Sequence, residues 1–154
     1  VCSSDLPRAV INSLYIKPEV LEQHNLRLEA KYRAMRDEEV LVDLQFMEDA
    51  EYAVCAYGTT ARIALTAVRK ARAAGIKVGL VRPITLWPFP EKAISEIAGR
   101  VKAILTVEMS LGQMVDDVKI AANGACPVIF YGRTGGMIPG VNEILGQITA
   151  LKEA

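Results

Sequence analysis

The sequence contains few of the residues that carry metal, redox or acid–base chemistry. Its 154 residues include three cysteines and one histidine, and the cysteines, Cys2, Cys55 and Cys126, stand far apart with no C-x-x-C pair. This pattern predicts no metal site, no iron–sulfur ligands and no disulfide framework. We interpret the histidine, His24, as a packed or hydrogen-bonded imidazole. Because no Ser–His–acid, Cys–His or paired-carboxylate arrangement is visible, we predict no catalytic residue in this chain.

An excess of charge of either sign is also missing. Eighteen Lys and Arg residues balance 18 Asp and Glu residues, so the formal net charge is zero. We therefore expect no nucleic-acid partner and no binding to acidic lipid. No apolar run approaches the roughly 18 residues of a membrane span, and no signal-peptide pattern opens the chain, so we expect no membrane contact and a cytoplasmic location.

The amino-terminal part of the chain divides into two segments that precede a larger domain. Residues 1–7 do not resemble the rest of the sequence, and we interpret them as an artefact of the source reading frame or a tag. On this interpretation the natural polypeptide extends further upstream. Residues 8–38 are predicted to form an extended linker and an arm helix over about 18–36, since proline suits a first helical turn and apolar residues recur on one stripe. The domain is predicted to span 39–154.

Residues 39–154 alternate between short apolar runs and amphipathic stretches. Strands are predicted at 51–57, 77–81, 102–108 and 128–131, and helices at 58–74, 91–99, 112–122 and about 141–151. The segment 40–46 alternates apolar and polar residues, which predicts a half-buried edge strand. This order is typical of a three-layer α/β fold, a parallel-dominated sheet with helices on both faces.

A proline-rich stretch, R-P-I-T-L-W-P-F-P over 82–90, follows the second of these strands. Its three prolines fix backbone φ angles and remove donors, which excludes regular helix and central strand. The carboxyl ends of strands in open α/β sheets are where ligands or partners bind. Trp87 and Phe89 are therefore candidate anchors of a protein interface. Burial of both rings on the domain's own helix is an equally weighted alternative.

Gly58, Thr59 and Thr60 lie between a strand and a helix amino terminus, where backbone N–H groups bind phosphate or carboxylate. The pattern is too short for a nucleotide motif, and a tight turn with a threonine N-cap is the favoured alternative. Arg82 and Glu108 are expected at the same edge of the sheet. They would form a structural ion pair or contact a ligand, with neither preferred.

A glycine-rich segment, Y-G-R-T-G-G over 131–136, follows the last strand. Glycine allows close backbone approach, and arginine offers a planar, two-pronged grip on carboxylate or phosphate. We favour a binding function over a plain connector for four of its residues, Arg133, Thr134, Gly135 and Gly136.

Four motifs in this order make the chain resemble one family: V-C-A-Y-G-T-T-A-R, G-L-V-R-P-I-T-L-W-P-F-P, V-E-M-S-L-G-Q-M and F-Y-G-R-T-G-G. The chain resembles the carboxyl-terminal part of the alpha-type subunit of 2-oxoacid:ferredoxin oxidoreductases over residues 8 to about 152. The stretch 11–32 is similar to the linker helix of the 3-methyl-2-oxobutanoate (2-oxoisovalerate) dehydrogenase branch. Arg62 and Gln113 lie within these motifs and complete the set of ligand or interface candidates.

The resemblance implies a fold like the transketolase carboxyl-terminal domain, with a five-stranded mixed sheet. It implies oxidative decarboxylation of a 2-oxoacid, of branched-chain type, to acyl-CoA by the whole enzyme. That enzyme uses thiamine diphosphate, Mg²⁺ and iron–sulfur clusters, takes coenzyme A as co-substrate and passes electrons to ferredoxin. The implied partners are a thiamine pyrophosphate-binding subunit, an iron–sulfur subunit and, through the complex, ferredoxin. Neither thiamine-binding domain nor a G-D-G…N magnesium motif occurs in this sequence.

The function we predict is that of an assembly domain, inactive alone and holding no cofactor itself. The alternative is an autonomous α/β module that binds a nucleotide or a CoA-like phosphate at Gly58–Thr60 and Arg133. A domain of another thiamine enzyme, such as a pyruvate dehydrogenase beta chain, ranks lower, because such a domain lacks an evident match to L-W-P-F-P and Y-G-R-T-G-G.

Overall fold

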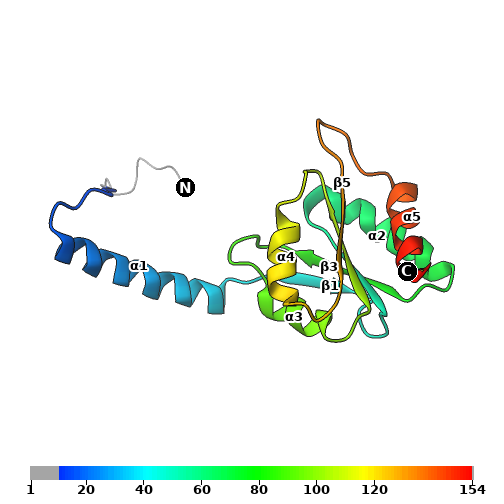
Figure 1. Ribbon diagram of the computed structural model, residues 1–154, viewed down its shortest axis with the longest axis horizontal. Helices are drawn as coiled ribbons and strands as arrows, with labels where there is room; N and C mark the ends of the chain where they lie inside the picture. The colour runs from blue at the N-terminus through cyan, green and yellow to red at the C-terminus, as the bar shows by residue number, and fades with distance from the viewer. Residues whose placement is uncertain (1–10, 154) are drawn as a thin grey trace, which may run out of the picture. The chain divides into compact units, whose positions relative to one another are not determined.

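The computed structural model describes residues 11–153 (Figure 1), which fall into two compact units. One unit ends at Glu38 and the other begins at Glu39. The predicted artefact or tag, residues 1–7, lies outside the described residues, as do the first three residues of the predicted linker.

The first unit holds the arm helix, α1 (Pro18–Glu38), close to the predicted bounds. An ion pair between Glu29 and Arg33 spans one helical turn, with 2.8 Å between the charged atoms. The Tyr15 hydroxyl lies 3.2 Å from Nδ1 of His24, and the centroids of the two rings are 4.8 Å apart, with the ring planes tilted by 32°. His24 is thus a hydrogen-bonded imidazole, as predicted.

The second unit is built on one five-stranded sheet. Its strands are β1 (Val42–Gln45), β2 (Tyr52–Cys55), β3 (Val78–Pro83), β4 (Ala103–Glu108) and β5 (Val128–Gly132). They lie in the order β1-β3-β2-β4-β5, all parallel except β1, which pairs antiparallel with β3. The predicted parallel-dominated mixed sheet is confirmed, and the edge strand predicted at 40–46 is its antiparallel member.

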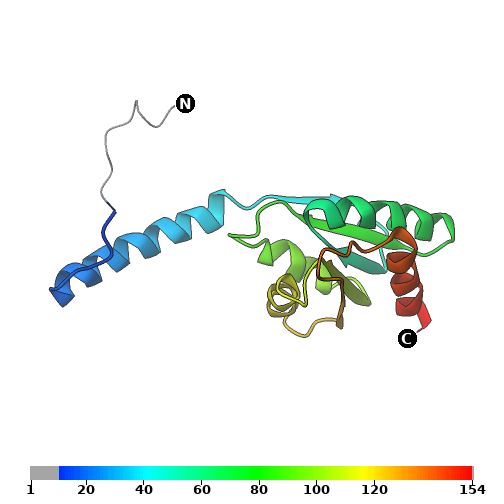
Figure 2. The same cartoon turned by 90° about the horizontal axis from the view of Figure 1, so that it is seen from above.

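Four helices complete the layers: α2 (Gly58–Ala73), α3 (Glu91–Ala98), α4 (Met114–Ala122) and α5 (Val141–Glu153). Helices α2 and α5 cover one face of the sheet, and α3 and α4 cover the other (Figures 1 and 2). Strands β2 and β4 are buried along their whole length, because a parallel strand between two helical layers has no face left for water. This explains the continuous apolar runs in the sequence.

The Cys55 thiol lies inside the α3–α4 layer and is 1% exposed. Burial, and to a lesser extent the charge of Glu108, raise the pKa of Cys55 above its ordinary value. Thiol reagents attack the thiolate, so we expect Cys55 to be alkylated at least about tenfold more slowly in the native protein than in denaturant at pH 8. Peptide mapping after timed iodoacetamide treatment measures this ratio. Equal rates in the two states would show that the thiol is accessible.

Candidate functional site

The loops that follow β2, β3, β4 and β5 gather at one edge of the sheet, because these four strands run parallel. We call this the carboxyl edge. All of the candidate residues from the sequence belong to it, on the strand ends, on the loops or in the first turns of the helices that follow. This is the position where open α/β sheets bind ligands and partners.

After β2, the chain enters α2 directly at Gly58, which has a positive φ of 55°. The N-cap is Tyr57, in extended conformation and without a side-chain cap hydrogen bond. The predicted threonine N-cap is therefore wrong: Thr59 and Thr60 lie inside the first turn, since glycine lets the helix begin before them. Thr59 and Arg62 are exposed and Thr60 is buried.

At the end of β4, the Glu108 carboxylate is completely buried. It caps α4 from the preceding strand, because its two oxygens accept hydrogen bonds at 2.9–3.2 Å from Ser110 Oγ and from the backbone N–H groups of Gln113, Met114 and Val115. A negative charge at a helix amino terminus is favoured by the helix dipole. The arrangement is structural and fixes the loop that leads from β4 to α4.

Arg82, on β3, does not pair with Glu108 in the described part of the chain, so of the two open alternatives the structural ion pair is wrong. The physical reason is that the carboxylate of Glu108 is already occupied by backbone donors. Arg82 is half-buried opposite Asp43 of β1, and its Nε is buried without a hydrogen-bond partner among the described residues.

The proline-rich loop between β3 and α3 separates its two aromatic rings. Trp87, which precedes a cis Pro88, is 53% exposed, whereas Phe89 packs against the α3–α4 core. Burial against the domain's own helices therefore applies to Phe89 only, and the interface role of Trp87 stays a prediction. Backbone hydrogen bonds from Ile84 and Thr85 to the Leu41 carbonyl tie this loop to the chain before β1.

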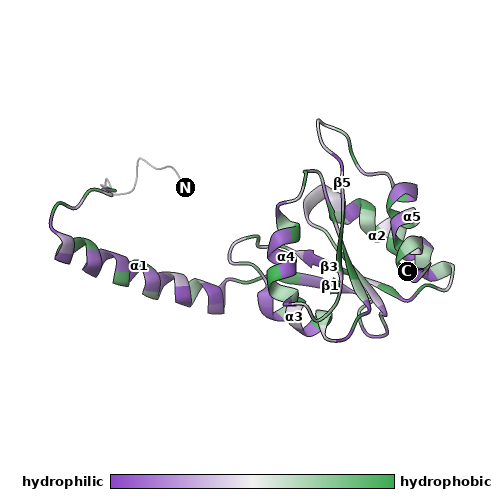
Figure 3. Cartoon of the chain, in the orientation of Figure 1, coloured by the Kyte–Doolittle hydropathy of each residue, from purple (hydrophilic) through white to green (hydrophobic). Residues whose placement is uncertain are grey.

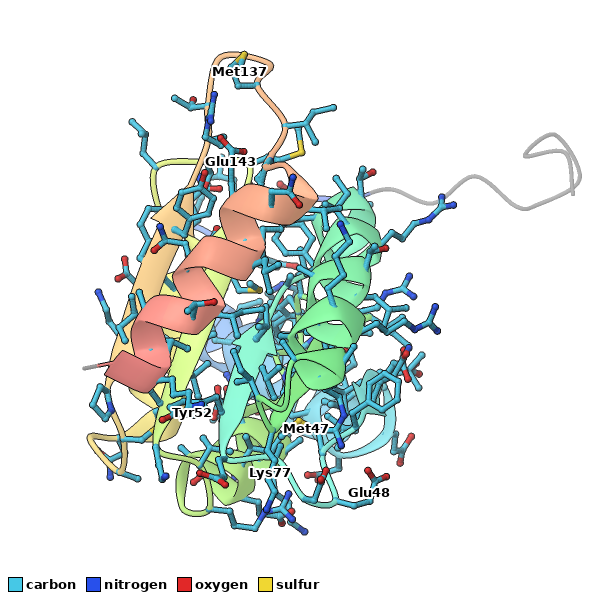
Figure 4. The ribbon with its side chains drawn as sticks, turned by 90° about the vertical axis from the view of Figure 1, so that its right-hand side faces the viewer. Met47, Glu48, Tyr52, Lys77, Met137 and Glu143 are labelled. Atoms are coloured by element: carbon cyan, nitrogen blue, oxygen red, sulfur yellow. The ribbon has the colours of Figure 1, made fainter. Side chains whose placement is uncertain are left out.

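The loop between β5 and α5 brings Arg133 to the first turn of α5, where its guanidinium bonds the Glu143 carboxylate. Glu143 also accepts from the Gly140 N–H at 2.6 Å, near the start of the helix, where Figure 4 labels it. The Tyr131 hydroxyl and the Glu143 charge raise the pKa of Arg133 above its usual value. Arg133 is thus engaged within the domain. The next three residues, Thr134, Gly135 and Gly136, are exposed.

A set of exposed apolar side chains at the carboxyl edge was not predicted from the sequence. Together with Trp87 they form what we call the apolar rim, which comprises Ile84, Leu86, Trp87, Met109, Leu111, Met137 and Ile138. These side chains are 41–83% exposed and come from the loops after β3, β4 and β5. Exposed apolar side chains at an edge where partners bind are suited to contact another protein. The sequence signal that could have identified these residues is their position directly after the predicted strands.

The described residues offer no cluster of three or more His, Cys, Asp or Glu side chains arranged for a metal ion. Within the same part of the chain, no helix has the length and apolar character needed to cross a membrane.

Solved structures with the same fold define the class of this domain. A 2-oxoglutarate:ferredoxin oxidoreductase from Magnetococcus marinus, with 2-oxoglutarate, coenzyme A and succinyl-CoA bound, superposes with a TM-score of 0.73 at 18% identity, covering 89% of this chain and 24% of that one. A split-gene transketolase, an inactive beta4 tetramer, gives a TM-score of 0.62 at 18% identity, covering 72% and 41%. The domain has the predicted transketolase-like α/β fold.

Residues 50–144 match the family described as pyruvate:ferredoxin oxidoreductase core domain II, and the chain belongs to this family. It is 42% identical over 149 residues to the ketoisovalerate oxidoreductase subunit VorB of Methanothermobacter marburgensis, covering 96% of this chain and 42% of the relative. It is 38% identical over 135 residues to the 2-oxoglutarate synthase subunit KorA of the same organism, covering 88% and 36%. The chain thus spans about two fifths of these relatives. These matches do not favour the autonomous-module alternative.

Proposed function

We propose that this chain is the carboxyl-terminal part of a subunit of a 2-oxoacid:ferredoxin oxidoreductase that acts on a branched-chain 2-oxoacid. Its domain assembles the enzyme and does not itself catalyse. Family membership and the 42% identity to a ketoisovalerate oxidoreductase subunit support this proposal. The structural observation that carries the assembly function is the apolar rim at the carboxyl edge.

The reaction of the whole enzyme would use thiamine diphosphate, Mg²⁺, iron–sulfur clusters and coenzyme A, with electrons passing to ferredoxin in the cytoplasm. We place these groups on domains and subunits other than this one. The side chains at the carboxyl edge support that division of labour, because the acidic group Glu108 is already used to cap α4 and Arg133 is held by Glu143. Residues 8–38 would serve as linker and arm helix, and 39–154 as the transketolase C-terminal-like domain.

Within the rim, Trp87 is the residue best suited to anchor a partner. Tryptophan is enriched among residues that dominate binding energy, and this one stands on a loop stiffened by prolines and tied to the chain before β1. The partners we propose are the thiamine pyrophosphate-binding and iron–sulfur subunits. The other exposed candidates at this edge, among them Thr59, Arg62 and Gln113, would contribute to the polar margin of the interface.

We expect Trp87→Ala to weaken association with these subunits by about 2 kcal/mol or more, about 30-fold in Kd, because it removes a large apolar anchor. Titration of the purified chain against the other subunits, by calorimetry or interferometry, measures this change. Ile120→Ala is the matched control, since Ile120 is 71% exposed on α4, outside the rim. Unchanged affinity of Trp87→Ala, with thermal stability retained, would refute the proposed interface.

A further inference from the structure

Strand β5 forms an edge of the sheet and pairs on one side only, with β4. The Ile104 N–H donates to the Pro127 carbonyl at 2.9 Å, and the Arg133 N–H donates to the Glu108 carbonyl at 3.1 Å. Because the residues of a paired strand alternate in direction, 127, 129, 131 and 133 face β4. The N–H and C=O groups of Val128, Phe130 and Gly132 therefore point away from the sheet.

No described element of the second unit covers this open side. Figure 1 shows α4 and α5 on either side of β5, and Figure 4 shows β5 near one side of the domain. No backbone hydrogen bond to Val128, Phe130 or Gly132 outside the strand ladder occurs among the described residues. The strand is half-buried or exposed along its whole length, unlike β2 and β4.

The residues of β5 do not prevent its open side from pairing with another strand. Proteins protect open edges with charged residues, with proline or with short strands. The opposite edge strand, β1, has four residues and carries Asp43. In contrast, β5 has five residues, V-I-F-Y-G, with no charge and no proline, and most of it is hydrophobic (Figure 3). Its Phe130 is 36% exposed.

We propose that β5 pairs antiparallel with β5 of a second copy of this chain, in a register centred on Phe130. A two-fold axis at Phe130 places Val128 opposite Gly132 of the second copy, and each opposed pair exchanges two backbone hydrogen bonds. The pairing gives the outward N–H and C=O groups of all three residues a partner. No like charges meet within the strand.

A second copy is the occupant that this strand fits, because the open segment is complementary to itself in that register. The two sheets become one continuous sheet, and the contact removes both open β5 edges at once. The rim residues come from the loops after β3, β4 and β5, whereas the pairing uses the backbone of β5 itself, so the two contacts are made by different residues. The inference is therefore independent of the proposed function.

Sedimentation equilibrium of the 154-residue chain and of two variants tests the pairing. We expect a dimer for the unaltered chain and for Leu44→Lys, which adds the same charge to the other edge strand at a similarly exposed position. We expect Phe130→Lys to raise the dimer dissociation constant at least about 100-fold, because it sets two lysines against each other at the two-fold axis. A monomeric unaltered chain, or a Phe130→Lys dimer of undiminished affinity, would overturn the proposal.

Hydrogen exchange of the unaltered chain tests the same contact without any substitution, so the test stands even where Phe130→Lys fails to fold. We expect the N–H groups of Phe130 and Gly132 to be protected at concentrations that favour the dimer and to exchange rapidly on dilution. Rapid exchange at every concentration would contradict the pairing. A Trp87→Ala variant distinguishes the two surfaces: it should leave the dimer intact, and its dissociation would mean that the copies meet through the rim instead.

Discussion

Glu108→Ala is expected to lower the free energy of unfolding by about 3 kcal/mol. The Glu108 carboxylate is completely buried, and its acceptors hold the Ser110 hydroxyl and three backbone N–H groups at the start of α4. Removing the carboxylate leaves these donors without a partner in a place that water cannot easily reach. Each buried unsatisfied donor costs about 1–3 kcal/mol, and relaxation of the loop reduces the sum.

The conservative variant Glu108→Gln separates hydrogen bonding from charge. Glutamine keeps one acceptor oxygen but directs an NH₂ group toward N–H donors, and it has no charge to interact with the helix dipole. We expect it to lose about half as much stability as Glu108→Ala. Glu108→Gln should be less destabilising than Glu108→Ala because the donors are divided between the two carboxylate oxygens. The Val115 N–H donates to one oxygen and the N–H groups of Gln113 and Met114 donate to the other, so the single oxygen of glutamine can satisfy only one of these two sets.

Urea unfolding followed by far-UV circular dichroism measures both variants. Glu143→Ala provides the matched control, because Glu143 accepts the Gly140 N–H near the start of α5 in a similar way but has a side chain that is 41% exposed. Water replaces that carboxylate, so we expect a loss below about 1 kcal/mol. A similar small loss for Glu108→Ala would show that the α4 amino terminus finds other partners.

The strands could be predicted because burial on both faces leaves a strong mark on the sequence. The segments around Val54 and Leu105 are continuous apolar runs, and the alternation at 40–46 correctly indicated a half-buried edge strand, although Leu44 of its apolar set is 43% exposed. Parallel order followed from strand–helix alternation, and it placed all of the candidate loops at one edge. The hydrophobicity pattern and the order of strands and helices were therefore sufficient to predict the sheet and the edge that carries the candidate loops.

The side-chain contacts at the carboxyl edge were not predictable in the same way. The partners of Glu108 are backbone N–H groups, which every residue has, so no residue type indicates them. Trp87 and Phe89 have the same proline-rich surroundings, and only the packing of α3 and α4 partly buries Phe89. Leu111 is 83% exposed, although a leucine in an α/β sequence is ordinarily assigned to the core.

Gly132→Ala is expected to cost about 2–3 kcal/mol of stability through steric overlap alone. A Cβ atom on Gly132 would lie well inside 3.0 Å of the Ser110 carbonyl oxygen and of the Phe130 ring. The backbone of Gly132 is not in the left-handed region, so the cost does not arise from its conformation. Because one of the obstructing atoms belongs to the backbone, a rotamer change cannot relieve the overlap.

The loop between β4 and α4 must move to accept this Cβ, and the same loop carries Met109 and Leu111 of the apolar rim. We therefore expect Gly132→Ala to reduce both the unfolding free energy and the affinity for partner subunits. Gly146→Ala on the exposed side of α5 is the control: no atom lies within 4 Å of the added Cβ, so alanine should stabilise by about 1 kcal/mol. Chemical denaturation of the pair measures the contrast, and a Gly132→Ala variant as stable as Gly146→Ala would mean that this loop yields freely and cannot hold the rim in place.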